Sequence, residues 1–330
     1  MNLIPNGYLV DDYMLFGDLG RGSVLAKGYA ALFPDLSASD DQAFMDLESD
    51  LRLMLGCLNA DERLQLQFYT SSDFAGPLAR FKDASRRNSQ IDICTSVREE
   101  LVSRFQGRME EGTLIHTQVR LSLSSQLPRF VTDSGRRARG FEDVFKVLRR
   151  SFEQREQFFN LLLASYGGSV RGLDNPGHYG EMLRFWSPGQ ARVLKQKGDE
   201  IDWLRTVEDL CRFSEIAPRA EPDHGFFLDG HYFGVWVFKT MPRATWAKTM
   251  EPFFHLTIPN LRVVVNMQPL SVEGEIRHEE ERFSKLLSNL DPQNPSLQSE
   301  VGLDKHRDRM RRLMSNQVLP FKVQIMVIGH

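Results

Sequence analysis

Histidine and its neighbours offer the first candidate for chemistry in this chain. Residues 278–280 read His-Glu-Glu, as at the start of a zinc-protease helix, but Arg282 stands where the second histidine ligand would be needed. His224 and His231 flank a short apolar run and could meet in space, although a hairpin that carries two polar residues explains them equally well. The pattern favours solvated polar residues over a metal site.

The three cysteines are the candidates for nucleophilic or redox chemistry. Cys57, Cys94 and Cys211 form no Cys-x-x-Cys pair, and their odd number is typical of neither a disulfide framework nor a structural zinc site. Cys57 falls on the apolar face of a predicted helix, which favours a buried and inert thiol. This cysteine usage fits a reducing cytoplasm.

Nucleotide hydrolysis would require a P-loop, in which Gly-x-x-x-x-Gly-Lys precedes Ser or Thr. The backbone amides of such a loop hold the phosphates, the lysine neutralises them, and the hydroxyl holds magnesium. No such string occurs, and the nearest glycine-rich segment, 17–22, lacks both the lysine and the hydroxyl. We therefore expect no ATP-hydrolysing site and no cofactor or metal in this chain.

Clustered arginines supply the strongest candidate for binding. Arg136, Arg137 and Arg139 lie in a glycine-containing loop that could dock an acidic partner, an anionic lipid or nucleic acid, with a merely solvated loop as the alternative. The basic clusters at 80–87 and 305–312 are interleaved with acidic residues, which favours ordinary surface. The formal net charge of -3, from 41 basic and 44 acidic residues, argues against a dedicated nucleic-acid binder.

Hydrophobic periodicity predicts the elements that must position these residues. In the first half, a helix is expected to follow an N-cap at Ser37 or Ser39, and the strand at 64–69 alternates so that one of its faces is polar. The expected order is strand 7–15, turn 17–22, strand 23–33, helix to residue 58, strand 64–69, helix 91–108 and strand 113–124.

The second half repeats this order after a helical middle. The middle is expected to contain a long helix at 141–166 that ends at two glycines, followed by helices at 180–186 and 190–198. The second half is expected to run through strands 226–230 and 232–240, helix 245–255, strand 261–268, helices 272–289 and 303–316, and strand 321–328. Trp236 and Phe238 fall on one of these strands, where core packing is favoured over base stacking.

These elements predict an α+β fold of two related units joined by a helical segment. Each unit has the order strand-strand-helix-strand-helix-strand and is expected to be ferredoxin-like. The expected boundaries are 1–135, 136–218 and 219–330. No stretch approaches the ~20 apolar residues that span a bilayer, so any membrane association is expected to be peripheral. Because the last strand runs to the end of the sequence, we expect the chain to be a fragment.

Four stretches carry a resemblance to a known family. They are GYLVDDYMLFGD at 7–18, SVLAKGYAALFPDLSASDDQAFMDLESDLRLMLGCL at 23–58, LQLQFYTSSD at 64–73 and GVWVFKTMPRATWAKTMEPFFHLTIPNLRVVVNMQP at 234–269. Together they resemble the N-terminal region of TraC-like ATPases of bacterial conjugation and type IV secretion. The resemblance extends over most of the chain in element order and pattern.

The resemblance implies a role without implying a site. In the family a RecA-like motor domain with Walker A and B motifs follows, and that domain uses ATP and magnesium to power pilus assembly and substrate transfer. The present chain stops before any motor, so it is expected to be inactive alone, and no catalytic residue can be carried over. It is expected to be cytoplasmic and peripheral to the inner membrane, to dock the motor onto inner-membrane subunits and to help it oligomerise.

Two rival functions follow from the residues themselves. A stand-alone nucleic-acid-binding α+β protein would use the arginine loop and strand aromatics, and its binding would depend steeply on salt. An enzyme with an unfamiliar site between the two units would show a deep cleft with convergent polar groups.

Overall fold

The fold is that of a computed structural model, which describes part of the chain. The described residues are 7–18, 22–33, 40–71, 74, 78–79, 81–83, 92–111, 113–114, 116–127, 140–186, 201–211, 220–221, 225–228, 231–239, 258, 260–288, 297–315 and 318–329. The helices predicted at 190–198 and 245–255 lie outside them.

The first predicted strand is in fact a hairpin. β1 (Gly7–Val10) and β2 (Tyr13–Asp18) pair antiparallel, and β3 (Gly22–Leu32) follows. The prediction of one strand over 7–15 was wrong because Asp11 and Asp12 both adopt positive φ, 48° and 66°, as the two central residues of a tight hairpin turn do.

The remaining elements of the first half confirm the predicted order. They are α1 (Asp41–Gly56), β4 (Glu62–Ser71), α3 (Asp92–Glu110) and β5 (His116–Gln126). The N-cap of α1 is Asp40 and not Ser37 or Ser39, because the Asp40 side chain accepts a hydrogen bond from the Ala43 amide at 2.9 Å.

The middle and the second half also follow the predicted order, with additional short elements. The middle contains α4 (Phe141–Ala164), β6 (Ser169–Gly172), α5 (Asn175–Trp186) and α7 (Val207–Cys211). The second half contains β7 (Ala220–Glu221), β8 (Gly225–Leu228), β9 (His231–Val237), β10 (Arg262–Pro269), α9 (Val272–Ser288), α10 (Leu297–Met314) and β11 (Phe321–Gly329). β6, β7 and α7 were not predicted, and α5 begins five residues earlier than expected.

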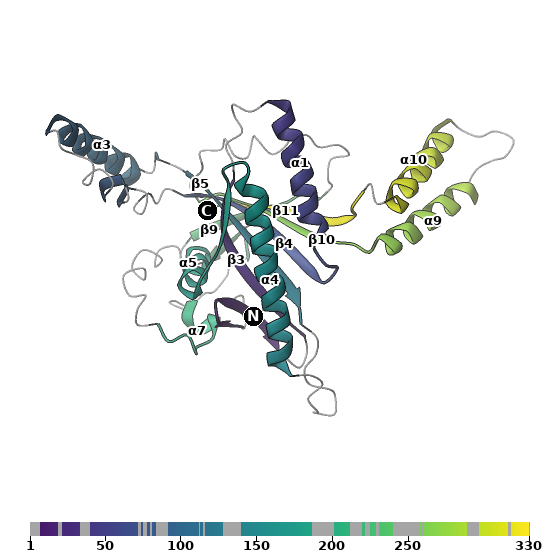
Figure 1. Ribbon diagram of the computed structural model, residues 1–330, viewed down its shortest axis with the longest axis horizontal. Coiled ribbons are helices and arrows are strands. Elements are labelled where there is room, and N and C mark those ends of the chain that lie inside the picture. The colour runs from purple at the N-terminus through teal and green to yellow at the C-terminus, as the bar shows by residue number, and fades with distance from the viewer. Residues whose placement is uncertain are drawn as a thin grey trace.

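Strands from both halves of the chain form one antiparallel sheet, which confirms the α+β class (Figure 1). The strand order is β1-β2-β3-β5-β4-β10-β11-β9-β8-β7, and β6 pairs with β3. The two predicted units meet where β4 pairs with β10, over a register that runs from Tyr69 opposite Arg262 to Leu64 opposite Met267. Their strands are therefore continuous in hydrogen bonding.

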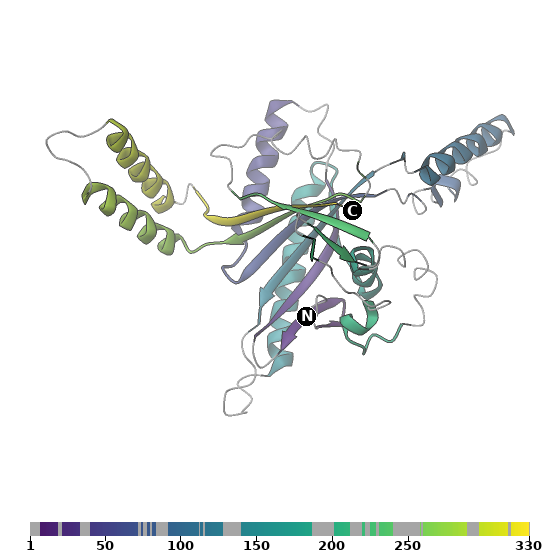
Figure 2. The same cartoon turned by 180° about the vertical axis from the view of Figure 1, so that it is seen from behind.

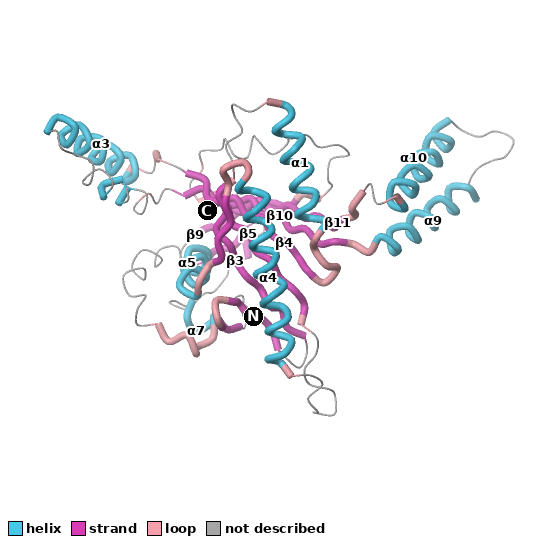
Figure 3. The backbone as a smooth tube through the Cα atoms, viewed as in Figure 1, coloured by secondary structure: helices cyan, strands magenta, loops and turns pink. Residues whose placement is uncertain are grey.

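Helices α1 and α4 cover one face of this sheet (Figures 1 and 3). Alternate strand residues, among them Leu25, Leu64 and Leu123, pack against Phe152 and Phe159 of α4 in the main core. On the opposite face α5 and α7 pack beside the first hairpin (Figure 2), where Tyr179, Val207 and Cys211 are buried together with Leu9.

Two helical insertions project from opposite ends of the sheet (Figure 1). We call α3, which lies between β4 and β5, the α3 arm, and α9 with α10, which lie between β10 and β11, the hairpin arm. β4 and β10 are antiparallel neighbours, so the chain leaves them in opposite directions. No helix in the described part of the chain is long and apolar enough to cross a bilayer.

Candidate functional site

The predicted binding arginines Arg136, Arg137 and Arg139 lie outside the described residues. The chain enters their segment after Leu127, whose amide donates to the Ser23 carbonyl at 2.8 Å, and leaves it at Gly140, the N-cap position of α4. A role for these arginines in binding an acidic partner stays a prediction.

Of the other basic clusters, the one at 305–312 lies on α10, where Arg309 contacts buried Glu279 at 3.3 Å, and most of the one at 80–87 lies outside the described residues. In α10, Arg312 pairs with Asp308 at 2.9 Å and Arg307 with Asp304 at 3.5 Å. These exposed ion pairs fit the expectation of a solvated helix and contribute little to stability.

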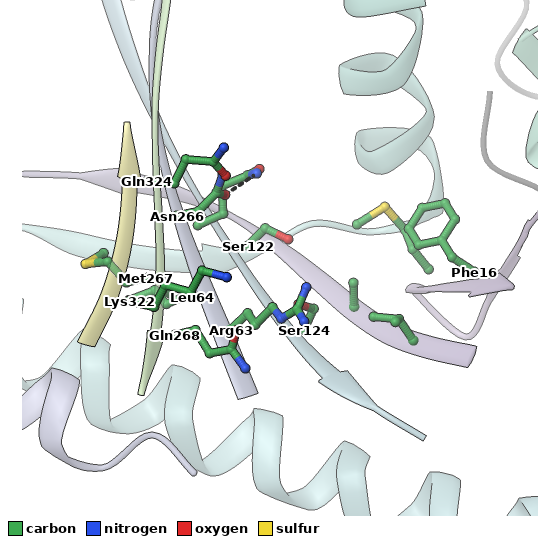
Figure 4. Close-up of a pocket in the computed structure, with 14 residues that line it drawn as sticks. Phe16, Arg63, Leu64, Ser122, Ser124, Asn266, Met267, Gln268, Lys322 and Gln324 are labelled. Carbon is green, nitrogen blue, oxygen red and sulfur yellow. Dashed lines mark hydrogen bonds between the residues drawn. The ribbon is translucent and has the colours of Figure 1, made fainter. Parts of the chain in front are cut away.

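The clearest open site is a polar depression on the sheet face opposite α1 and α4 (Figure 4). It has a volume of about 510 Å³ and lies over neighbouring strands from β2 to β11. Its lining residues are Met14, Phe16, Val24, Ala26, Arg63, Leu64, Gln65, Ser122, Ser124, Asn266, Met267, Gln268, Lys322 and Gln324.

Strand register brings the polar side chains of this site into line. Ser122, Gln65, Asn266 and Gln324 stand opposite one another on four adjacent strands, and we call them the polar row. The Gln65 side-chain amide donates to Asn266 Oδ1 at 2.8 Å. The row exists because leucines at the intervening positions of β4 and β5 point into the helix-covered core.

The described residues that line the site carry positive charge and no negative charge. Arg63 and Lys322 are exposed at one end of the polar row, no carboxylate lines the depression, and within the described residues neither cation makes an ion pair. β10 separates their strands, which places the two backbones about 10 Å apart. Amides, hydroxyls and these two cations suit the binding of an extended polar anion.

A second depression, of about 310 Å³, lies beside α5 and joins residues of both halves. Arg120 Nε and Arg184 contact the Glu181 carboxylate at 2.9 and 2.6 Å. Burial raises the pKa of Glu181, but the charges of Arg120 and Arg184 outweigh burial and hold it below its ordinary value. A carboxylate so firmly ionised and paired is a poor general base.

Buried Arg262 completes this cluster by stacking on two aromatic rings. Its guanidinium lies 4.5 Å from the centre of the Tyr69 ring and 5.1 Å from that of Phe185. Since Arg262 belongs to β10 and Phe185 to α5, the contact anchors α5 over the junction of the two halves. We interpret the cluster as structural.

His178 is the buried histidine that sequence reasoning missed. Its Nε2 lies 3.1 Å from the Asp12 carbonyl, to which Lys27 Nζ donates at 2.8 Å. Burial, with the nearby charge of Lys27, lowers the pKa of His178 to about 4, so the ring is neutral at pH 7. The contacts of His178 and Lys27 with the Asp12 carbonyl join the first hairpin to α5. No periodic pattern in the sequence predicts such a contact.

The residues suspected of metal or thiol chemistry do not assemble a centre where they are described. His278 lies exposed on α9, and the described residues contain no group of three or more His, Cys, Asp or Glu side chains that could hold a metal ion. Burial raises the pKa of Cys57 and raises that of Cys211 to about 12, which keeps both thiols protonated.

Comparison with known proteins adds no relative. No protein-family model matches the chain, and none of the curated proteins matches it. Function is therefore argued from the residues and their arrangement.

Proposed function

We propose that this chain is the docking and oligomerisation region of a TraC-like ATPase of conjugation or type IV secretion. It would work in the cytoplasm, peripheral to the inner membrane. The observation that supports this proposal is the pair of helical arms at opposite ends of one continuous sheet. A sheet with two projecting helical arms could bind an inner-membrane subunit through one arm and a neighbouring copy of this chain through the other. The motor would then be held at the membrane. The ATP and magnesium of the family belong to its motor domain.

The resemblance in the stretches quoted above supports the choice of machine, and the arms support the mode of action. In this proposal the chain contributes binding surfaces, and hydrolysis takes place in the motor. The purified chain should accordingly neither bind nor hydrolyse ATP. Saturable binding of a labelled ATP analogue by the chain alone would contradict this division of labour.

A transfer assay tests the proposal in cells. Overproduced in donor cells that carry the intact machine, the chain should occupy the docking site of the motor and lower the frequency of transfer. The matched control replaces the hairpin arm, residues 271–319, with a short turn. This excision is feasible because the Leu270 amide already donates to the Pro320 carbonyl at 2.9 Å. Equal inhibition by both proteins, or none by either, would contradict docking through this arm.

The polar depression favours a second candidate function, nucleic-acid binding by a stand-alone protein. Arg63 and Lys322 could contact phosphates while the polar row hydrogen-bonds to bases or sugars. Each phosphate contact on a single strand contributes about -0.7 to the slope of log K against log salt.

The salt dependence of single-strand binding tests this alternative. Substituting Arg63→Gln and Lys322→Gln together should make the slope shallower by about 1.4, since two phosphate contacts are lost. Lys285→Gln on exposed α9 is the control and should leave the slope unchanged. The absence of measurable binding by the native chain at low salt would reject the alternative.

A further inference from the structure

The depression beside α5, which we call the α5 depression, is built by strand register from both halves of the chain. Its floor includes two rows on the sheet face that carries the polar row, in which Arg120, Gln67, Val264 and Met326 stand opposite one another, as do Arg262 and Ile328. From α5, Glu181, Met182 and Phe185 add to the lining. Its volume of about 310 Å³ lies at the lower end of the range for small-molecule sites, about 300 to 1,000 Å³.

The α5 depression holds more positive than negative charge. Among the described residues that line it, Arg120 and Arg262 are cations and Glu181 is the one carboxylate. His178, whose pKa burial lowers to about 4, is neutral at pH 7. Glu181 already accepts hydrogen bonds from Arg120 and from Arg184, both through Oε1. Within the described residues no carboxylate forms an ion pair with Arg262, so its charge is the least compensated.

Burial makes this charge on Arg262 unfavourable. Arg262 is 6% exposed, and its guanidinium packs against the rings of Tyr69 and Phe185. Burial lowers the pKa of Arg262, although Tyr69 and Glu181 act to raise it. A buried cation is stabilised when an anion lies beside it, and a carboxylate can accept from two N–H groups of a guanidinium at once. Because Arg262 lines the depression, an anion bound there could reach it.

Apolar side chains form the wall beside Arg262. They come from β10, β11 and α5 and include Val264, Met326, Ile328, Met182 and Phe185. These side chains favour an apolar ligand body, since they offer contact area and no hydrogen bonds. One unpaired guanidinium beside an apolar wall therefore suits a ligand with a single negative charge at one end.

We propose that the α5 depression binds a small carboxylic acid with an apolar body, such as an aromatic acid. The carboxylate pairs with Arg262, and the body packs against Met182 and Met326. Such a ligand contacts β10, β11 and α5 together and so holds α5 on the sheet. Neither arm contributes to the lining, so this site is separate from the docking role of the arms.

Benzoate titrations of the native full-length chain, followed by ligand-observed NMR, test the site. Benzoate should bind saturably, with a Kd of about 1 mM for so small a ligand. Benzamide has the same shape and no charge, so it should bind at least about tenfold more weakly. Inorganic phosphate should not displace benzoate, because it lacks the apolar body.

Two variants remove the site in different ways. Arg262→Met removes the charge and should still fold, because Glu181 keeps Arg120 and Arg184 as partners. Met326→Trp keeps Arg262 and fills the depression with a larger side chain. Circular dichroism checks that each variant is folded. Each should weaken benzoate binding at least about tenfold.

Lys322→Met is the matched control. It removes an exposed cation from the same sheet face, in the polar depression and outside the α5 depression. Its affinity for benzoate should equal that of the native chain. A loss of binding in this variant like that in Arg262→Met would show general attraction of anions to the sheet and would reject the site.

Other results would also overturn the proposal. Absence of saturable benzoate binding by the native chain, equal binding of benzamide, or undiminished binding by the folded variants would each do so. Displacement of benzoate by inorganic phosphate would assign the site to phosphate instead. Tighter binding of a short peptide that ends in phenylalanine, lost when its carboxyl group is amidated, would assign the depression to the C-terminus of a partner protein.

Discussion

Individual buried polar residues decide how the first hairpin and α5 are joined to the sheet. His178 is 2% exposed and neutral, and Lys27 donates to the carbonyls of both Asp12 and Leu173 at 2.8 Å. Polar groups buried in this way stabilise a fold only while each keeps its partner and its protonation state.

The lowered pKa of His178 predicts a loss of stability in mild acid. As pH falls from about 6.5 to about 4, the unfolded state takes up a proton that the folded state refuses, so this contribution is complete above pH 6.5 and is lost toward pH 4. The full difference is about 3 kcal/mol. Urea titrations at several pH values in this range give the free energy of unfolding, which should fall more steeply with falling pH for the native chain than for His178→Asn. The same pH dependence in both proteins would contradict the assignment.

Gly28 marks the place where the His178 ring meets the sheet. A β-carbon there would lie 2.9 Å from His178 Cε1, so Gly28→Ala should displace the ring and cost about 1 to 3 kcal/mol. Gly180→Ala in α5 is the matched control, because a β-carbon there meets nothing within 4 Å and alanine favours the helix. Denaturant midpoints of the two variants should move in opposite directions.

At the scale of elements, each arm is an insertion between two strands that are already neighbours. Ser71 stands opposite His116 and Pro269 opposite Phe321, so the two strands that flank each arm pair with each other up to the base of the arm. The arms should therefore unfold independently of the sheet.

Glu279 offers a test of this independence. Glu279→Ala leaves Arg309 and His306 without their carboxylate and should weaken the hairpin arm by about 1 to 3 kcal/mol, less than for a fully buried ion pair because the Arg309 side chain is 52% exposed and solvent screens its charge. Hydrogen exchange should accelerate in α9 and α10 while β10 and β11 keep their protection. Faster exchange throughout the sheet would show that the arm and sheet unfold together.

Periodicity predicted most elements because their signals are local. It missed the turn at Asp11 and Asp12, since two aspartates inside an apolar run do not reveal a positive φ. The alternation at 64–69 correctly predicted one polar face, yet only the register shows that Gln65, Asn266 and Gln324 form a row. The predicted binding arginines lie outside the described residues, so they add nothing to this comparison.

For the whole molecule, the decisive feature is the pairing of β4 with β10. It joins residues about 200 positions apart in sequence, such as Gln65 and Asn266, and such pairing leaves no periodic signal. The consequence is a single platform whose two arms point in opposite directions (Figures 1 and 2). This arrangement favours a molecule that connects others.

Purification from the membrane tests the central claim most directly. A tagged chain, and matched forms without the α3 arm or the hairpin arm, would be produced in cells that run the secretion machine and recovered from detergent-solubilised inner membranes. The proposal predicts that the native chain carries inner-membrane subunits of that machine with it and that losing an arm depletes them. Recovery of the native chain without any secretion subunit would contradict the docking function.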